Sequence, residues 1–176
     1  MIFLALPPMV VLLIPVILLE IFVSKKQIEK ENRKKVWLGV TGANIFSTFI
    51  GWPVAWILLV LIQMLTGGGG AHGLDSPLGL ILSVTQQAPW LIPYESDLYW
   101  MVPVALGVLL VPFFFVSVYA ERFILRKVWK AEEKDTVKAF SWKAHLYSYT
   151  FLIIVVMCYA FYSINENAQQ VVGGNG

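Results

Sequence analysis

Four long apolar stretches run along this chain, and shorter segments rich in polar residues separate them. The stretches cover residues 2–23, 38–65, 98–120 and 144–164. Each is close to or above the roughly 20 helical residues that cross the hydrocarbon core of a bilayer. A helix satisfies its own backbone groups inside a membrane, whereas an isolated strand does not. The pattern therefore predicts four transmembrane helices.

The composition favours a membrane protein over a soluble domain. Hydrophobic residues make up 58% of the 176 positions and charged residues only 14%, whereas a soluble domain carries about 25% charged residues. The mean hydropathy is +0.71. The alternating pattern of a transmembrane barrel is absent from the sequence. The first stretch has basic residues after it and none before it, unlike a signal peptide, so we expect a retained helix.

The basic residues predict how the chain is oriented. All 13 of them lie in the two segments that follow the first and third apolar stretches. The positive-inside rule places these segments in the cytoplasm and both termini outside. The fold class predicted is thus all-α and polytopic, with two tandem transmembrane hairpins at 1–66 and 98–176, the second ending in a short outer tail. The expected location is a cell membrane, and this topology is typical of small proteins of the bacterial inner membrane.

The connection at 67–97 is expected to lie outside the cell and to contain one short helix. The glycines at 67–70 do not continue a helix cheaply, so the second helix should end there. Ser76 or Asp75 can cap a new helix whose first turn contains Pro77, and Pro89 should limit it. This helix is too short to span the membrane, so we expect it at the outer interface.

The two halves of the chain resemble each other when they are compared at an offset of 101 residues. The aligned pairs are Glu20 with Glu121, Ala43 with Ala144, Asn44 with His145, and Ser47 with Ser148. Both halves run in the same direction, which predicts a parallel duplication. A carboxylate inside a membrane needs a donor or a proton. We expect each glutamate to meet the amide or imidazole of the next helix, as a structural clip or, alternatively, as a proton or ion site.

Small residues recur at every fourth position of the second stretch, at Gly39, Ala43, Ser47 and Gly51. This spacing places them on one helix face, where another backbone can approach closely. A short connection makes consecutive helices neighbours, so we expect the first helix to pack on this face. A contact between subunits is the alternative.

The sequence offers little catalytic or cofactor chemistry. One cysteine, Cys158, excludes an internal disulfide and a multi-cysteine metal site. No motif of a hydrolase, metalloprotease or nucleotide-binding loop is present, so we predict no enzyme activity, no cofactor and no metal.

The expected partners are the lipid bilayer, anionic lipid headgroups at the basic segments, and a homo-oligomer or larger membrane complex. Acidic residues interrupt both basic segments, which disfavours nucleic acid. The first functional prediction is a structural, assembly or accessory subunit that acts through helix–helix contacts. The alternative is an oligomeric transporter or channel unit that uses Glu20 and Glu121 as proton or ion sites.

Overall fold

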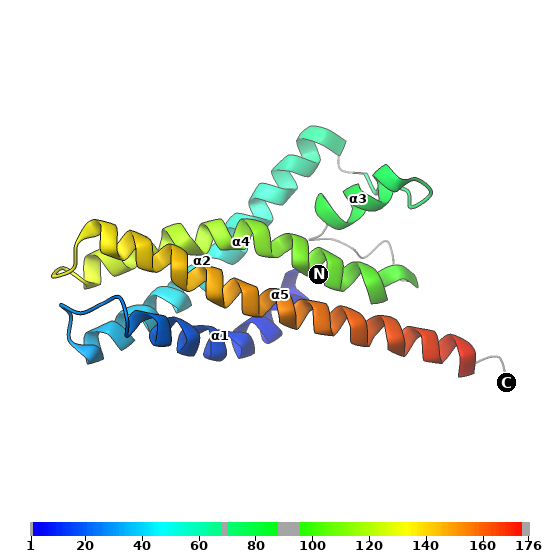
Figure 1. Ribbon diagram of the computed structural model, residues 1–176. Coiled ribbons are helices and arrows are strands. Elements are labelled where there is room, and N and C mark those ends of the chain that lie inside the picture. The colour runs from blue at the N-terminus through cyan, green and yellow to red at the C-terminus, as the bar shows by residue number, and fades with distance from the viewer. Residues whose placement is uncertain (1, 68–69, 88–95, 174–176) are drawn as a thin grey trace. The chain divides into compact units, whose positions relative to one another are not determined.

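The computed structural model describes residues 2–67, 70–87 and 96–173. Over these residues the chain forms five α-helices (Figure 1). They are α1 (Ile2–Ser24), α2 (Arg33–Gly67), α3 (Pro77–Thr85), α4 (Leu98–Val128) and α5 (Lys134–Gly173). Among the described residues, α2, α4 and α5 contain segments long and apolar enough to cross a membrane. The all-helical prediction is confirmed, whereas the number of four spans and the tandem hairpins stay predictions.

The helix ends follow local chemistry. α2 and α5 begin in the basic segments, several residues before the apolar stretches, because lysine, arginine and alanine favour helix outside the hydrocarbon as well. α2 ends at Gly67, where the glycine run begins. α3 begins as expected, since the Gly79 N–H donates to the Ser76 hydroxyl at 3.0 Å and Pro77 occupies the first turn. The expected limit at Pro89 lies outside the described residues.

The helices contribute to two compact units. We name the first the basic unit, because it contains all 13 basic residues; it comprises Leu6–Ala55 and Pro112–Leu152. The second, named the α3 unit, comprises Met1–Ala5, Trp56–Val111 and Ile153–Gly176. Because α1, α2, α4 and α5 each contribute to both units, this division does not follow the order of the chain.

The basic unit has a continuous apolar core. In it, α1 and the first part of α2 pack with the last part of α4 and the first part of α5 (Figure 1). The core residues are Ile21, Ile28, Val36, Val40, Ala43, Leu125, Trp129, Val137, Phe140 and Ala144. Large apolar side chains also face outward, for example Phe49, which is 74% exposed. Such an apolar exterior suits contact with lipid.

The small-residue face of α2 packs against α4 and the residue that follows it. A Cβ atom on Gly39 would lie 2.6 Å from Trp129 Nε1, and one on Gly51 would lie 3.5 Å from Phe113 Cδ1. Ser47, between them, donates a hydrogen bond to Glu121 of α4. We expected α1 as the partner of this face. The contacts with α4 correct that expectation, because the helix that packs on this face is α4 and not α1, which precedes α2 in the sequence.

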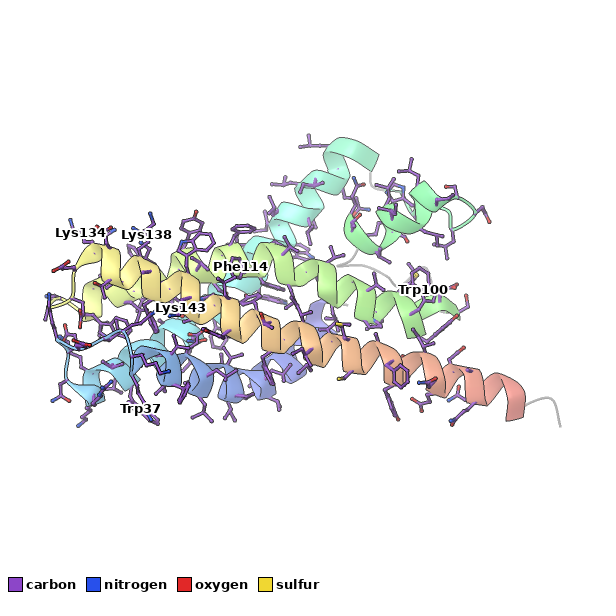
Figure 2. The ribbon with its side chains drawn as sticks, viewed as in Figure 1. Trp37, Trp100, Phe114, Lys134, Lys138 and Lys143 are labelled. Atoms are coloured by element: carbon purple, nitrogen blue, oxygen red, sulfur yellow. The ribbon has the colours of Figure 1, made fainter. Side chains whose placement is uncertain are left out.

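The two connections of the basic unit are joined by a reciprocal pair of hydrogen bonds, which we name the loop clasp. The Lys30 N–H donates to Glu132 Oε1 at 2.7 Å, and the Ala131 N–H donates to Glu31 Oε1 at 2.9 Å. Lys30 and Ala131 are 101 positions apart, as are Glu31 and Glu132. Figure 2 shows basic side chains at this end of the unit, among them Lys134 and Lys138 at the start of α5.

Glycine at position 39 should be essential for packing. In Gly39→Ala the new methyl group would overlap the buried indole of Trp129, whose Nε1–H donates to the Lys35 carbonyl at 3.4 Å. We expect a loss of about 1–3 kcal/mol in the free energy of unfolding, measured by denaturant titration in detergent. The matched control is Gly42→Ala in the same helix, where no described atom lies within 4 Å of the added Cβ. It should be neutral or stabilising by up to about 1 kcal/mol; equal effects of both variants would contradict this packing.

The loop clasp should weaken in acid. The side-chain hydrogen bond from Lys35 and the backbone hydrogen bond from Ala131 hold the pKa of Glu31 below its ordinary value. A carboxylate whose pKa is lowered by folding contributes fully to the stability of the protein at pH values above its unfolded pKa of about 4.3. This contribution is lost as the pH falls through the lower pKa of the folded state. We therefore expect the melting temperature of the parent to decrease when the pH is lowered below about 4. The melting temperature of Glu31→Gln should decrease less over the same pH range.

At pH 7, Glu31→Gln should cost roughly 1–3 kcal/mol, because a hydrogen-bonded charge is lost. Glu29→Gln, at an exposed position of the same connection, should retain the acid sensitivity of the parent. A parallel acid response in Glu31→Gln and the parent would show that Glu31 does not hold the clasp.

Candidate functional site

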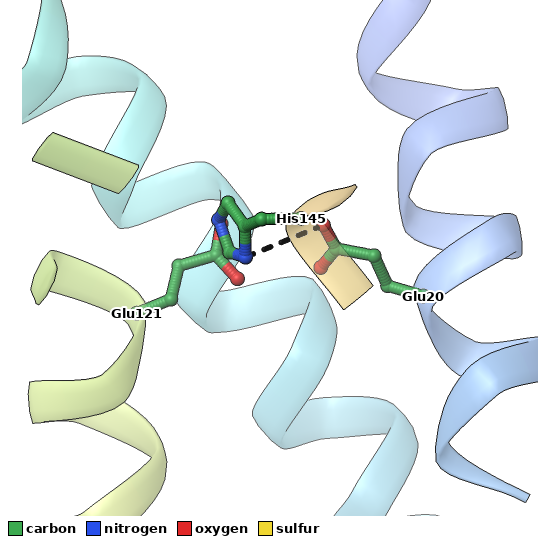
Figure 3. Close-up of side chains that lie close together, drawn as sticks. All are labelled: Glu20, Glu121 and His145. Atoms are coloured by element: carbon green, nitrogen blue, oxygen red, sulfur yellow. Dashed lines mark ion pairs between the residues drawn. The ribbon is translucent and has the colours of Figure 1, made fainter. Parts of the chain in front are cut away.

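Six polar side chains from four helices meet inside the basic unit, and we name them the polar cluster. Its members are Glu20 of α1, Asn44 and Ser47 of α2, Glu121 of α4, and His145 and Ser148 of α5. Figure 3 shows three of them, Glu20, Glu121 and His145. Each is buried; Glu20 and His145 are 1% exposed and Glu121 is 2% exposed. The sequence predicted two separate pairs of these residues, and the structure places all of them together.

Two serine hydrogen bonds of the polar cluster cross between the two halves of the chain, while the expected bond from Asn44 to Glu20 lies within the first half. Ser47 donates to Glu121 Oε1 at 2.8 Å, and Ser148 donates to Glu20 Oε1 at 3.0 Å. These two bonds are equivalent at the offset of 101 residues. The Asn44 amide lies between the carboxylates, with Nδ2 2.7 Å from Glu20 Oε2 and 3.3 Å from Glu121 Oε2. Each half therefore supplies donors to the carboxylate of the other half.

Helical spacing aims these side chains into one place. Asn44 and Ser47 are three residues apart, as are His145 and Ser148, so each pair shares one helix face. Ala43 and Ala144 precede the two pairs and are fully buried. Their small side chains allow the helices to approach closely enough for short polar contacts.

The His145 ring has one nitrogen in a hydrogen bond and one without. Nδ1 lies 2.7 Å from the Ser141 carbonyl oxygen, one helical turn earlier, and 4.0 Å from Glu20 Oε1. Since a carbonyl only accepts, this contact places the proton of a neutral ring on Nδ1 and leaves the lone pair on Nε2. Nε2 lies 3.3 Å from Glu121 Oε1, yet it forms no hydrogen bond to any described residue.

Two aromatic residues that the sequence analysis did not identify lie against the imidazole. Tyr149 stacks on His145 with a centroid distance of 6.0 Å, and Phe114 meets the ring edge-on at 6.2 Å. The Tyr149 hydroxyl donates to Ser117 Oγ at 3.1 Å. One indication was available: Tyr149 follows His145 by four residues, which places it on the same helix face.

The polar cluster is able to hold a positively charged species. Glu20, Glu121 and His145 each offer a ligand atom, and these atoms lie within 4.8 Å of one another. Two carboxylates at this separation repel each other strongly where the dielectric constant is low. The neutral donors around them reduce the cost of burial but add no net charge. A proton or a metal ion would supply the missing positive charge.

Comparisons of the chain with known proteins found no match. No protein-family model, curated protein or solved structure matches the chain. The chemistry of the polar cluster has to be derived from its own residues.

Proposed function

We propose that this protein is a multi-pass membrane protein that binds and moves a cation through the polar cluster. The observation that carries the proposal is the enclosure of two carboxylates and an imidazole in an apolar helical unit. Burial of an unpaired charge costs several kcal/mol, which is a large part of the free energy of unfolding of a typical domain. Ionisable residues inside membrane proteins commonly belong to ion or proton pathways.

The topology that accompanies this function has four spans. α1 contains 23 residues and is about 35 Å long at 1.5 Å per residue, which matches a hydrocarbon core of about 30 Å. With α2, α4 and α5 it makes two tandem hairpins. The positive-inside rule then assigns the loop clasp to the cytoplasm, both termini to the outer side, and α3 to the outer interface. A bacterial inner membrane fits this arrangement.

An internal duplication also supports a cation site. The crossed serine–glutamate bonds of the polar cluster and the reciprocal bonds of the loop clasp relate residues at one common offset. In transporters built from repeats, the binding site lies at the interface between the repeats. The polar cluster occupies the corresponding position between the two halves of this chain.

Prolines provide places where two of the helices can bend. The division between the two units falls after Ala55 in α2 and before Pro112 in α4, and Pro53 lies two residues before the first of these positions. Each proline removes a helical hydrogen bond, so bending costs less there. A cation enclosed in the basic unit needs such a change to enter or leave.

The alternative is an accessory subunit that acts through helix contacts. The residues Gly39, Ser47 and Gly51 of the small-residue face contact other parts of the same chain. This face is therefore occupied, which makes the alternative the weaker of the two.

Site-directed labelling should test the topology. In a Cys158→Ser background, single cysteines at Lys30 and Lys134 should resist an impermeant thiol reagent in intact cells, because both positions belong to cytoplasmic segments. Cysteines at Ser96 and Asn167 should react. Reaction at Lys30 or Lys134 from outside would reverse the orientation and remove the proposed topology.

Cation movement should depend on both carboxylates. We expect the full-length protein in liposomes to admit protons or a divalent metal ion, followed with entrapped pH-sensitive and metal-sensitive dyes. Glu20→Gln and Glu121→Gln should lower the rate at least about tenfold, since about 1.4 kcal/mol of lost cation stabilisation already has that effect. Glu29→Gln should leave the rate unchanged.

Stability separates transport from a structural clip. Glutamine at position 20 can still accept from Ser148, so the thermal midpoint in detergent should stay near that of the parent. Glu20→Leu leaves the Asn44 amide and the Ser148 hydroxyl without this acceptor and should cost roughly 1–3 kcal/mol. Absence of cation movement in the folded parent, or equal rates in the parent and both glutamine variants, would favour the accessory subunit.

A further inference from the structure

We propose that the polar cluster binds a first-row divalent metal ion of the Zn²⁺ or Mn²⁺ class. The ligands would be His145 Nε2 and one carboxylate oxygen from each of Glu20 and Glu121. This inference rests on the proposed function, which requires a cation at the same place, and it specifies which cation.

The orientation of His145 is the first reason. A histidine that binds a metal usually donates its other ring N–H to a carbonyl or carboxylate, which fixes the tautomer and turns the free lone pair toward the metal. Nδ1 of His145 makes this contact with the Ser141 carbonyl at 2.7 Å. Nε2 lies on a side chain that is 2% exposed and forms no hydrogen bond within the described chain. Its lone pair is therefore available to a ligand beside Glu121.

The distances are the second reason. Four-coordinate Zn²⁺ with bonds of about 2.1 Å separates its ligand atoms by roughly 3.4 Å. Nε2 of His145 is 3.3 Å from Glu121 Oε1. Glu20, Glu121 and His145 each offer one ligand atom, and these atoms lie within 4.8 Å of one another. Glu20 Oε1 lies 4.0 Å from the other ring nitrogen, Nδ1, so the Glu20 side chain would have to turn toward Nε2 when an ion binds.

The charge of the polar cluster suits a divalent ion. Two carboxylates and a neutral imidazole carry a charge of −2, which one divalent ion or two protons would neutralise. A protonated ring would form an ion pair with Glu121 Oε1, 3.3 Å from Nε2, but no hydrogen bond joins these two atoms. A divalent ion would neutralise both carboxylates without that hydrogen bond, which removes most of the cost of burying them.

The surrounding donors complete a metal site. Each of the four carboxylate oxygens accepts one hydrogen bond, from Ser148 and Asn44 on Glu20 and from Ser47 and Asn44 on Glu121. Every oxygen therefore retains a lone pair for an ion. Such outer contacts hold ligands in place and commonly change metal affinity by about 10–100-fold. Oxygen and imidazole ligands without sulfur suit Zn²⁺, Mn²⁺ or Fe²⁺ better than Cu⁺.

Metal titration of the full-length protein in detergent tests the inference. After removal of metal with a chelator, calorimetry should show one Zn²⁺ or Mn²⁺ bound per chain, and Co²⁺ should give the absorption bands of a nitrogen–oxygen site. His145→Asn introduces asparagine, the residue found at the equivalent position 44 of the first half. This variant should bind the metal at least about tenfold more weakly. The control is His72→Asn, at the other histidine of the chain, which should bind as the parent does.

The outcomes separate this inference from the proposed function. If the folded parent binds neither metal yet moves protons in a manner that requires Glu20 and Glu121, the metal assignment is wrong and the proposed function stands. If it neither binds metal nor moves any cation, both are wrong. Binding that persists in His145→Asn and is lost in His72→Asn would place the metal elsewhere and overturn the assignment. Where His145→Asn fails to fold, Glu121→Gln tests the same site, and unchanged metal affinity in that variant would overturn the assignment.

Discussion

Two carboxylates enclosed in an apolar helical unit impose the main constraint on this protein. Each needs hydrogen-bond donors, and the pair needs a positive charge, because no water or lipid headgroup is available to supply either inside a bilayer. The donors come from α2 and α5, while the carboxylates come from α1 and α4. All four helices must therefore hold their register with one another. The apolar core of the basic unit helps to fix that register. In it the ring centroids of Trp129 and Phe140 lie 5.1 Å apart.

The equivalence of the two halves explains how one short chain satisfies both carboxylates. Ser47 and Ser148 perform the same task for opposite glutamates, and Glu31 and Glu132 do likewise for opposite backbone N–H groups. Within the polar cluster the two halves differ at one aligned position, which is Asn44 in the first half and His145 in the second. The amide donates to both carboxylates, whereas Nε2 of the imidazole forms no hydrogen bond within the described chain. The proposed metal site depends on this difference.

The close approach of α2 and α4 is a condition for the polar cluster. Gly39 makes room for the Trp129 indole and Gly51 contacts Phe113, and Ser47 lies between these two contacts. A bulkier residue along this face would separate the helices and lengthen the serine–glutamate hydrogen bond. The small-residue face is thus a means of positioning a buried carboxylate, beyond its general use in helix packing.

The sequence by itself determined the helices and the polar residues that matter. Apolar length, the cap at Ser76 and the distribution of basic residues are local properties, so the helical class and the start of α3 could be predicted without a structure. The contact of His145 with Ser141 is local as well, at a spacing of one turn. The tertiary structure decided which helices are neighbours. Periodicity shows which face of α2 is packed but not which helix packs on it, so the expected contact with α1 was wrong; the contacts found for this face are with α4 and Trp129. For the same reason the sequence suggested two polar pairs, and only the packing of four helices brought Glu20, Glu121 and His145 to one point.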